Sequence, residues 1–453
     1  MMNIRWQRGR TYLVIGSLVF GMLFGAGNLV FPVHLGQLAG ANWGPAAAGF
    51  ISSGVLLPLL ALLALSVTRS RGLFDLARPV GDWFALVFLI MVHATIGPLC
   101  ATPRTATVPY AIGIAPALPA KMQSLGLALF TGAFFLVAYF FSVKSGRVTE
   151  IIGKVLNPAF LVMLLVVFLL AFSRPMGKLS TPHPTSDYLT QPLANGFLQG
   201  YNTMDALAML IFGVTVVAAV QQMGFDNRAR SLATAKGGFI GILGIGVLYL
   251  GLIYLGTTSR NQFALATNGG TTLNQVAHYY LGTFGNVLLL TLATVTCLTT
   301  AMGLVIAFSQ DFHQRFPQIS YKTFLRLNCL LSFLIANLGL DQIVTWSTPV
   351  LMFLYPLAIV LICVALASPL FGRAPVVYRW ALGLTIIPAF FALVANVPPA
   401  LKGWTVSRLL TLTGWAEQHL PLFATGFAWL PFALVGTAIG LAVRQYQRYN
   451  AGK

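Results

Sequence analysis

Three glycines interrupt the first long apolar run of the chain, in the stretch FGMLFGAGNLVFP at residues 20–32. Gly25, Ala26 and Gly27 are followed by Asn28, which supplies an amide oxygen, and by a proline that removes one intrahelical hydrogen bond. A helix that breaks inside a membrane frees backbone groups that lipid cannot satisfy, so a break is tolerated only where it lines a cavity. Amides after the break attract a carboxylate, and carbonyls before it can hold a cation. We therefore predict a binding site here; alternatively, the glycines form a packing face of an unbroken helix.

A second set of candidate ligands is a group of threonines in the stretch TLATVTCLTTAMG. Thr296, Thr299 and Thr300 recur at a spacing that places their groups on one face of a helix. Hydroxyl and carbonyl oxygens are suitable ligands for a small, hard cation. The alternative is that each hydroxyl bonds a carbonyl four residues earlier on its own helix, as threonines in membrane helices often do.

Three titratable side chains within or beside the apolar runs are further candidates. Arg104 and Asp205 stand near the outer ends of two runs, where they would form a gate by pairing when the extracellular path closes. The alternative is two unrelated interfacial charges. His93 lies about 15 Å along its helix from Trp83, near the middle of a bilayer. It is either the carrier of a coupling proton or a neutral histidine bonded to a neighbour.

Long apolar helices must position these groups. Of the 453 residues, 57% are hydrophobic and only 8% are charged, and the mean hydropathy is +0.81, unlike a soluble domain. Runs of about 20 apolar residues, as a transmembrane helix requires, recur from end to end, whereas a barrel shows short alternating segments. We predict an all-α polytopic membrane protein, with about twelve transmembrane helices in a single domain over residues 1–453. The predicted spans are 11–35, 43–68, 84–103, 124–143, 155–173, 203–221, 237–259, 284–309, 325–340, 345–370, 380–401 and 422–443.

The distribution of basic residues predicts the orientation of these spans. Most of the 27 Lys and Arg residues fall on the segments that lie inside if both termini are cytoplasmic, as the positive-inside rule requires. The first apolar run is too long for a signal peptide, so we expect no cleavage. The net charge of +18 is spread over small groups on alternate loops, which favours anionic lipid over nucleic acid as the partner.

The tryptophans and cysteines add no catalytic chemistry. All eight Trp residues fall at or near predicted span ends, where they anchor the protein at the interface. The four Cys residues lie within spans without metal-ligand spacing, so we interpret them as apolar packing residues and expect no cofactor.

The order of the spans suggests two inverted halves. Many secondary transporters place their site at the bilayer midplane, between matching broken helices of two repeats. We predict a first repeat over 1–173, an inverted second repeat over 200–370 and two additional helices over 380–443. The sixth span should then break as the first does. Its stretch MLIFGVTVV offers Gly213, followed by residues of poor helix propensity, as the break.

Four stretches together carry a resemblance to a known family. They are FGAGNLVFP at 24–32, GPLCATPRTATVPYAIGIAP at 97–116, GYNTMDALAMLIFG at 200–213 and CLTTAMG at 297–303. In this order, and over nearly the whole chain, they resemble the bacterial branched-chain amino acid:cation symporters. That family belongs to the amino acid-polyamine-organocation superfamily, whose LeuT-type fold is a five-plus-five inverted repeat with broken helices 1 and 6.

The resemblance implies sodium-coupled uptake of leucine, isoleucine and valine across the bacterial inner (plasma) membrane, with sodium as the coupling ion. The substrate would then meet the two breaks, and the sodium ion would be held between the first and eighth spans. The implied substrate residues are Gly25, Ala26, Gly27, Asn28, Phe212, Gly213 and Val214. The implied sodium ligands are the carbonyls of Gly21, Phe24 and Thr296 and the hydroxyls of Thr299 and Thr300.

Two other classes of function stay open. One is a proton-coupled transporter of a small neutral solute that uses His93 as the proton carrier. The other is a membrane enzyme such as a prenyl- or phosphotransferase, which gathers acidic pairs with Mg²⁺ at the membrane face. The scattered single acids of the inner loops disfavour the enzyme.

Overall fold

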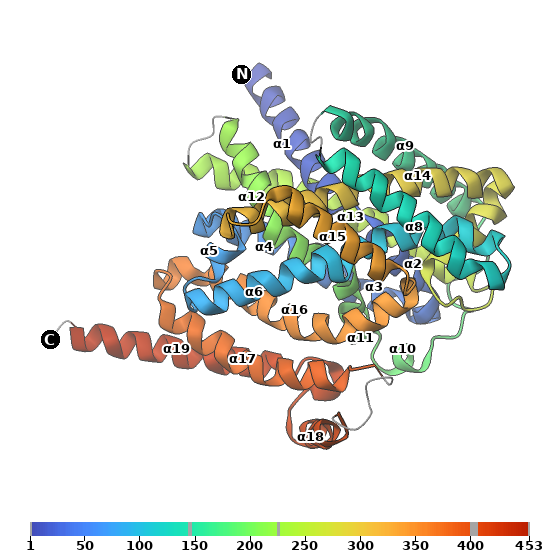
Figure 1. Cartoon of the computed structure of the whole chain (residues 1–453). Helices are drawn as coiled ribbons and strands as arrows, with labels where there is room; N and C mark the ends of the chain where they lie inside the picture. Colours follow the sequence, from blue (N-terminus) through green and yellow to red (C-terminus); the bar gives the residue numbers. More distant parts are fainter. Residues whose placement is uncertain (1, 144–146, 224–226, 399–405, 452–453) are drawn as a thin grey trace.

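The computed structural model describes residues 2–143, 147–223, 227–398 and 406–451, and these residues form helices and loops without any strand (Figure 1). Within them, 8 segments are long and apolar enough to cross a membrane, and Thr11–Leu23 and Phe160–Ser173 are shorter apolar helices. The predicted all-α polytopic class is confirmed. The 8 segments are Ala26–Thr68, Asp82–Ala117, Ala120–Val143, Asp205–Gln222, Leu232–Ser259, Gly269–Arg315, Leu340–Phe371 and Pro375–Ala395.

Each predicted span overlaps one or more helices, although the boundaries differ by several residues, and the end of the span 380–401, from residue 399 on, lies outside the described residues. The α-helices of the first half are α1 Met2–Leu23, α2 Ala26–Ala39, α3 Trp43–Ile51, α4 Leu57–Thr68, α5 Leu73–Ala77, α6 Asp82–Ala94, α7 Ala101–Pro109, α8 Ala120–Val143 and α9 Arg147–Ser173. The others are α10 Ser186–Thr190, α11 Pro192–Gly200, α12 Asp205–Gln222, α13 Asn227–Ser259, α14 Gly269–Arg315, α15 Tyr321–Ala336, α16 Leu340–Phe371, α17 Pro375–Ala395, α18 Val406–His419 and α19 Trp429–Ala451.

The third span is longer than the sequence predicted. Helical structure runs from Asp82 to Ala117 and bends at Gly97, inside the π-helical turn η3 (Thr95–Leu99) between α6 and α7. The polar stretch that follows the bend looks like a loop in a hydropathy pattern. Its side chains, including Arg104, are instead buried among neighbouring helices. Arg104 therefore lies inside the protein and not at an outer interface.

The first helix is broken where the sequence predicted. α1 ends at Leu23 and α2 begins at Ala26, so Phe24 and Gly25 separate two helical segments. Gly25 is extended, with φ −147° and ψ −167°. The glycine-rich stretch is thus a real interruption and not a packing face of one continuous helix.

The sixth helix is also broken, but not at the predicted residue. α11 ends at Gly200, the 3-10 turn η6 (Tyr201–Thr203) follows, and Met204 has a left-handed φ of 60° before α12 begins. Gly213 lies within the uninterrupted helix α12, so the prediction of a break there was wrong. A Cβ on Gly213 would lie 2.8 Å from Cδ1 of Leu65, which shows that this glycine allows α12 to pack closely on α4.

Helix α13 packs along both halves of the broken first helix. A Cβ on Gly241 would lie 2.4 Å from the carbonyl oxygen of Gly16 in α1. Further along, a Cβ on Gly256 would lie 1.9 Å from the carbonyl oxygen of Val33 in α2. Small residues at both crossings let the backbones touch, as is common for membrane helices.

We predict that Gly256→Ala destabilises the protein by about 1 to 3 kcal/mol or more, because the added methyl overlaps backbone that cannot rotate away. The measurement is thermal unfolding of the purified protein in detergent. Gly303→Ala is the matched control, since nothing lies within 4 Å of the Cβ it would add. Equal stability of the two variants would show that the α2–α13 crossing is not closely packed.

Candidate functional site

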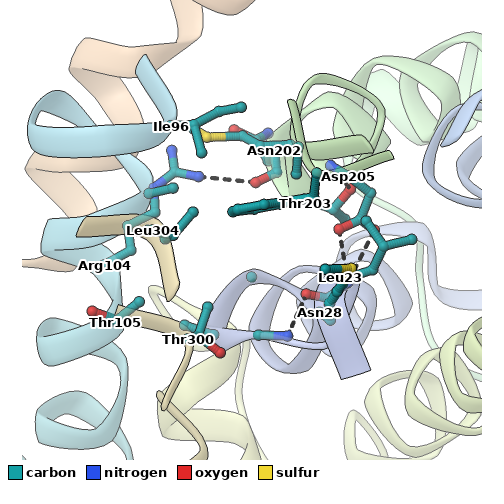
Figure 2. Close-up of a pocket in the computed structure, with 18 residues that line it drawn as sticks. Leu23, Asn28, Ile96, Arg104, Thr105, Asn202, Thr203, Asp205, Thr300 and Leu304 are labelled. Atoms are coloured by element: carbon teal, nitrogen blue, oxygen red, sulfur yellow. Dashed lines mark hydrogen bonds between the residues drawn. The ribbon is translucent and has the colours of Figure 1, made fainter. Parts of the chain in front are cut away.

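A cavity of about 50 Å³ lies between the two helix breaks, and helices α7 and α14 complete its wall (Figure 2). This volume holds a few water molecules. Its lining residues are Met22, Leu23, Gly25, Ala26, Gly27, Asn28, Ile96, Ala101, Arg104, Thr105, Asn202, Thr203, Met204, Asp205, Ala208, Phe212, Thr300 and Leu304. Residues from both breaks, far apart in the sequence, therefore meet at one place.

Asn28 joins the two breaks. Its Oδ1 accepts a hydrogen bond of 2.9 Å from the Gly25 amide, which caps the start of α2. Its Nδ2 donates to Oδ1 and Oδ2 of Asp205, at 3.0 and 2.9 Å, and also donates to the hydroxyl of Tyr249. A single amide side chain thus closes one helix end and binds the first residue of α12.

Asp205 is a buried acid whose carboxylate accepts several hydrogen bonds. Besides the Asn28 amide, the Tyr249 hydroxyl donates to its Oδ2 at 2.5 Å. Asp205 is the first residue of α12, where the helix dipole favours a negative charge. These interactions offset the cost of placing a carboxylate inside a membrane protein.

Arg104 is buried on the same cavity, at 2% exposure. Its Nη1 donates to the carbonyl oxygen of Asn202 at 2.9 Å, and its Nη2 donates to the hydroxyl of Ser347 in α16. The guanidinium also lies 5.0 Å from the centre of the Phe31 ring, a cation–π contact. These bonds place its positive charge beside the second break.

The predicted pairing of Arg104 with Asp205 is not found in this structure. Among the ion pairs between described residues none joins these two side chains, and Figure 2 shows them on opposite sides of the cavity. The physical reason is that the Asp205 carboxylate is turned toward Asn28 and Tyr249. Both residues nevertheless line the cavity, so they are not unrelated interfacial charges.

Predicted cation ligands from the first break and from α14 lie close together. The Thr300 hydroxyl donates to the carbonyl oxygens of Phe24, at 3.4 Å, and Thr296, at 3.1 Å. The Thr299 hydroxyl donates to the same Thr296 carbonyl at 2.8 Å. Of the three threonines, only Thr300 makes the expected bond to the carbonyl four residues earlier, and it also reaches across to the break. Thr299 bonds the carbonyl three residues earlier, and the buried Thr296 hydroxyl has no partner among the described residues.

The carbonyl of Gly21 is released by the break. In an unbroken helix it would accept from the amide of Gly25, but that amide donates to Asn28. A cation ligand set made of Gly21, Phe24 and the threonines would consist of oxygens only. Such a set suits a hard cation of low charge better than a transition metal.

His93 does not reach the cavity. Its Nε2 lies 2.8 Å from Oδ2 of Asp311 in α14, and Arg315 lies 3.6 Å from the other oxygen of that carboxylate. The rings of Phe308 and Phe312 pack edge-on against the imidazole. The bond to a neighbour that one interpretation of the sequence expected is present, and the neighbour is an acid within helix α14. The role of His93 as a proton carrier stays a prediction.

The implied substrate residues divide into two groups. Gly25, Ala26, Gly27, Asn28 and Phe212 line the cavity. Gly213 and Val214 are absent from its lining. The second break lies about ten residues earlier than predicted, and Gly213 faces α4 instead of the cavity.

Three residues of the site were not predicted from the sequence. They are Asn202 and Thr203 of the second break and Tyr249 of α13. The polar run GYNTMD in an otherwise apolar segment was the available signal for the break. No comparable signal exists for Tyr249, because its contact with Asn28 joins residues 221 positions apart.

We predict that Tyr249→Phe lowers stability by about 1.5 to 3 kcal/mol, since it removes a hydrogen bond to a charged group. The matched control is Tyr254→Phe on the same helix, whose hydroxyl makes only a 3.4 Å bond to the Ala171 carbonyl. The measurement is thermal unfolding in detergent. Similar losses for the two variants would mean that the Asp205 cluster contributes no special stability.

Comparison with known structures shows the fold. The chain matches Mhp1, a nucleobase-cation-symport-1 family transporter in a closed conformation with bromovinylhydantoin bound, with a TM-score of 0.56 and 11% identity. The match covers 96% of this chain and 93% of that one. MhsT in complex with L-phenylalanine matches with a TM-score of 0.50 and 15% identity, over 96% and 97% of the two chains. The LeuT-type fold that the resemblance implied is thereby confirmed.

Comparison with known sequences gives the family. Residues 8–447 match the family model described as branched-chain amino acid transport protein. The branched-chain amino acid permease BrnQ of Lactobacillus delbrueckii subsp. lactis is 40% identical over 92% of this chain and 93% of its own length. BraB of Bacillus subtilis, a permease of the same description, is 38% identical over 94% of each chain. The chain belongs to the branched-chain amino acid transport protein family.

Proposed function

We propose that this protein is a sodium-coupled symporter that carries leucine, isoleucine and valine into the bacterial cytoplasm across the plasma membrane by alternating access. The relatives that match over nearly their whole length are named branched-chain amino acid permeases, which supports the substrate class. The observation that carries the proposal is that both helix breaks face one cavity and are joined there by Asn28 and Asp205.

The walls of the cavity combine polar and apolar groups, as a site for an aliphatic amino acid requires, and a cavity that holds a few water molecules must widen to admit the substrate. Backbone of the two breaks, Arg104 and Asp205 provide polar groups, and apolar side chains of several helices provide the rest. The apolar wall consists of Met22, Leu23, Ile96, Ala208, Phe212 and Leu304. Discrimination among the three substrates should be shallow, because one methylene changes binding by only about 1 to 3 kcal/mol.

Coupling would act through the first break. The carbonyl of Phe24 belongs to the proposed cation ligands, and the adjacent Gly25 lines the substrate cavity. A sodium ion bound to Gly21, Phe24, Thr296, Thr299 and Thr300 would neutralise part of the carbonyl charge and hold the break in one conformation. A substrate that binds the same conformation then binds more tightly, and by linkage it strengthens ion binding equally.

We predict that a sodium gradient at constant pH drives uptake of labelled leucine into liposomes that contain the purified protein. Thr300→Val removes one proposed sodium ligand and should weaken the binding free energy of sodium by about 1.4 kcal/mol or more. The sodium concentration for half-maximal uptake should then rise about tenfold or more. The control is Thr291→Val on the same helix, which removes only a bond to the Val287 carbonyl. Uptake that is independent of sodium, or equal effects of the two variants, would contradict sodium binding at this site.

A proton-coupled transporter is the second candidate, because the side chain of the buried His93 lies 2.8 Å from the partly exposed carboxylate of Asp311, and polar groups inside a membrane protein often mark the path of an ion or proton. We predict that His93→Gln retains sodium-driven leucine uptake to within about twofold, since the glutamine amide can still donate to Asp311. The measurement repeats uptake with a pH gradient and no sodium. Uptake by the wild-type protein under that gradient, lost in the variant, would replace sodium with protons as the coupling ion.

A further inference from the structure

The proposed function counts Arg104 among the polar groups of the cavity but assigns no partner to its positive charge. Its side chain is 2% exposed and lines the cavity. Its two hydrogen bonds go to neutral oxygens, the carbonyl of Asn202 and the hydroxyl of Ser347. Within the described part of the chain it has no carboxylate partner, and its Nε has no hydrogen-bond partner. An arginine so deeply buried normally has an anion beside it.

The start of α2 adds to the positive potential at the same place. Ala26 and Gly27 belong to the first turn of α2, whose amides have no partner within the helix, and both residues line the cavity. A Cβ on Gly27 would lie 3.5 Å from the Asn202 carbonyl oxygen, the atom that Arg104 binds. The helix end and the guanidinium are therefore neighbours on either side of Asn202.

The opposite side of the cavity has the opposite charge. Figure 2 shows Asp205 across the cavity from Arg104. The carboxylate of Asp205 accepts hydrogen bonds from Asn28 and from Tyr249. A zwitterion with its carboxylate toward Arg104 and its ammonium toward Asp205 would have favourable interactions at both ends. The reverse orientation would place like charges together.

We propose that Arg104 binds the α-carboxylate of the transported amino acid, together with the first amides of α2. This inference rests on the proposed function, because it assigns one group of that substrate to one residue. The Asn202 carbonyl and the Ser347 hydroxyl hold the guanidinium in place, and its remaining donor capacity serves the carboxylate. Arg104 thus selects for substrates that carry a free carboxylate.

The experiment measures binding of L-leucine and of L-leucinamide, which keeps the side chain and the ammonium but replaces the carboxylate with a neutral amide. Dissociation constants come from ligand-dependent thermal stabilisation of the purified full-length protein. For the wild-type protein we expect leucine to bind at least about 100-fold more tightly than leucinamide, and for Arg104→Gln we expect this ratio to fall below about fivefold. Arg104→Lys keeps the charge but not the planar donors and should give an intermediate ratio.

The matched control is Arg326→Gln, which changes an exposed arginine whose side chain bonds the Lys322 carbonyl. This variant should prefer leucine over leucinamide by the same factor as the wild-type protein. A folded Arg104→Gln protein that keeps the wild-type ratio overturns the assignment, as does a wild-type protein that binds the two ligands equally. If Arg104→Gln does not fold, Arg104→Lys decides, and an unchanged ratio there overturns the assignment. Failure of the wild-type protein to bind leucine, isoleucine or valine would instead overturn the proposed function.

Discussion

The hydrogen bonds of the Asn28 amide are the interaction on which the arrangement of the site depends. A membrane interior gives no water to a broken helix, so the groups released at each break must find partners within the protein. The amide oxygen of Asn28 caps α2, and its nitrogen binds the acid that begins α12. One side chain therefore satisfies part of both breaks and fixes their separation, and the cavity follows from that separation.

This link also explains why two charges are tolerated in the interior. Asp205 is stabilised by the Asn28 amide, the Tyr249 hydroxyl and the start of a helix. Arg104 is stabilised less completely, by two neutral oxygens and one aromatic ring. The imbalance leaves the cavity with excess positive potential near α2. A binding site for an anionic ligand needs donors without a partner in the protein, because donors that are already hydrogen-bonded cannot also bind the ligand.

The sequence predicted the first break correctly and misplaced the second, for physical reasons that differ between the two. Two glycines beside Asn28 weaken a helix from within, and composition reveals this. The second break depends on a polar 3-10 turn and on the left-handed conformation of Met204, a residue type with no preference for that conformation. Gly213 misled the prediction, because glycine in a membrane helix serves close packing as often as interruption.

The location of Arg104 was misjudged because polar residues that face other helices resemble a loop in a hydropathy pattern. The contacts of Asn28 with Asp205 and of His93 with Asp311 could not be predicted either, since each joins residues more than 170 positions apart. The threonines of the proposed cation site were easier to predict from the sequence. The helical repeat alone places Thr296, Thr299 and Thr300 on one face of a helix. The contact of Thr300 with the Phe24 carbonyl could be learned only from the three-dimensional structure.

The crossings of α13 with α1 and α2 have a consequence for motion. Near Gly241 and Gly256, helix α13 contacts the backbone of α1 and of α2. It therefore connects the two halves of the broken first helix mechanically. The two halves cannot swing independently without bending α13 or separating one of these contacts. A transport cycle would therefore tilt α1, α2 and α13 as one rigid body, and the helices packed around that body would open and close the two entrances.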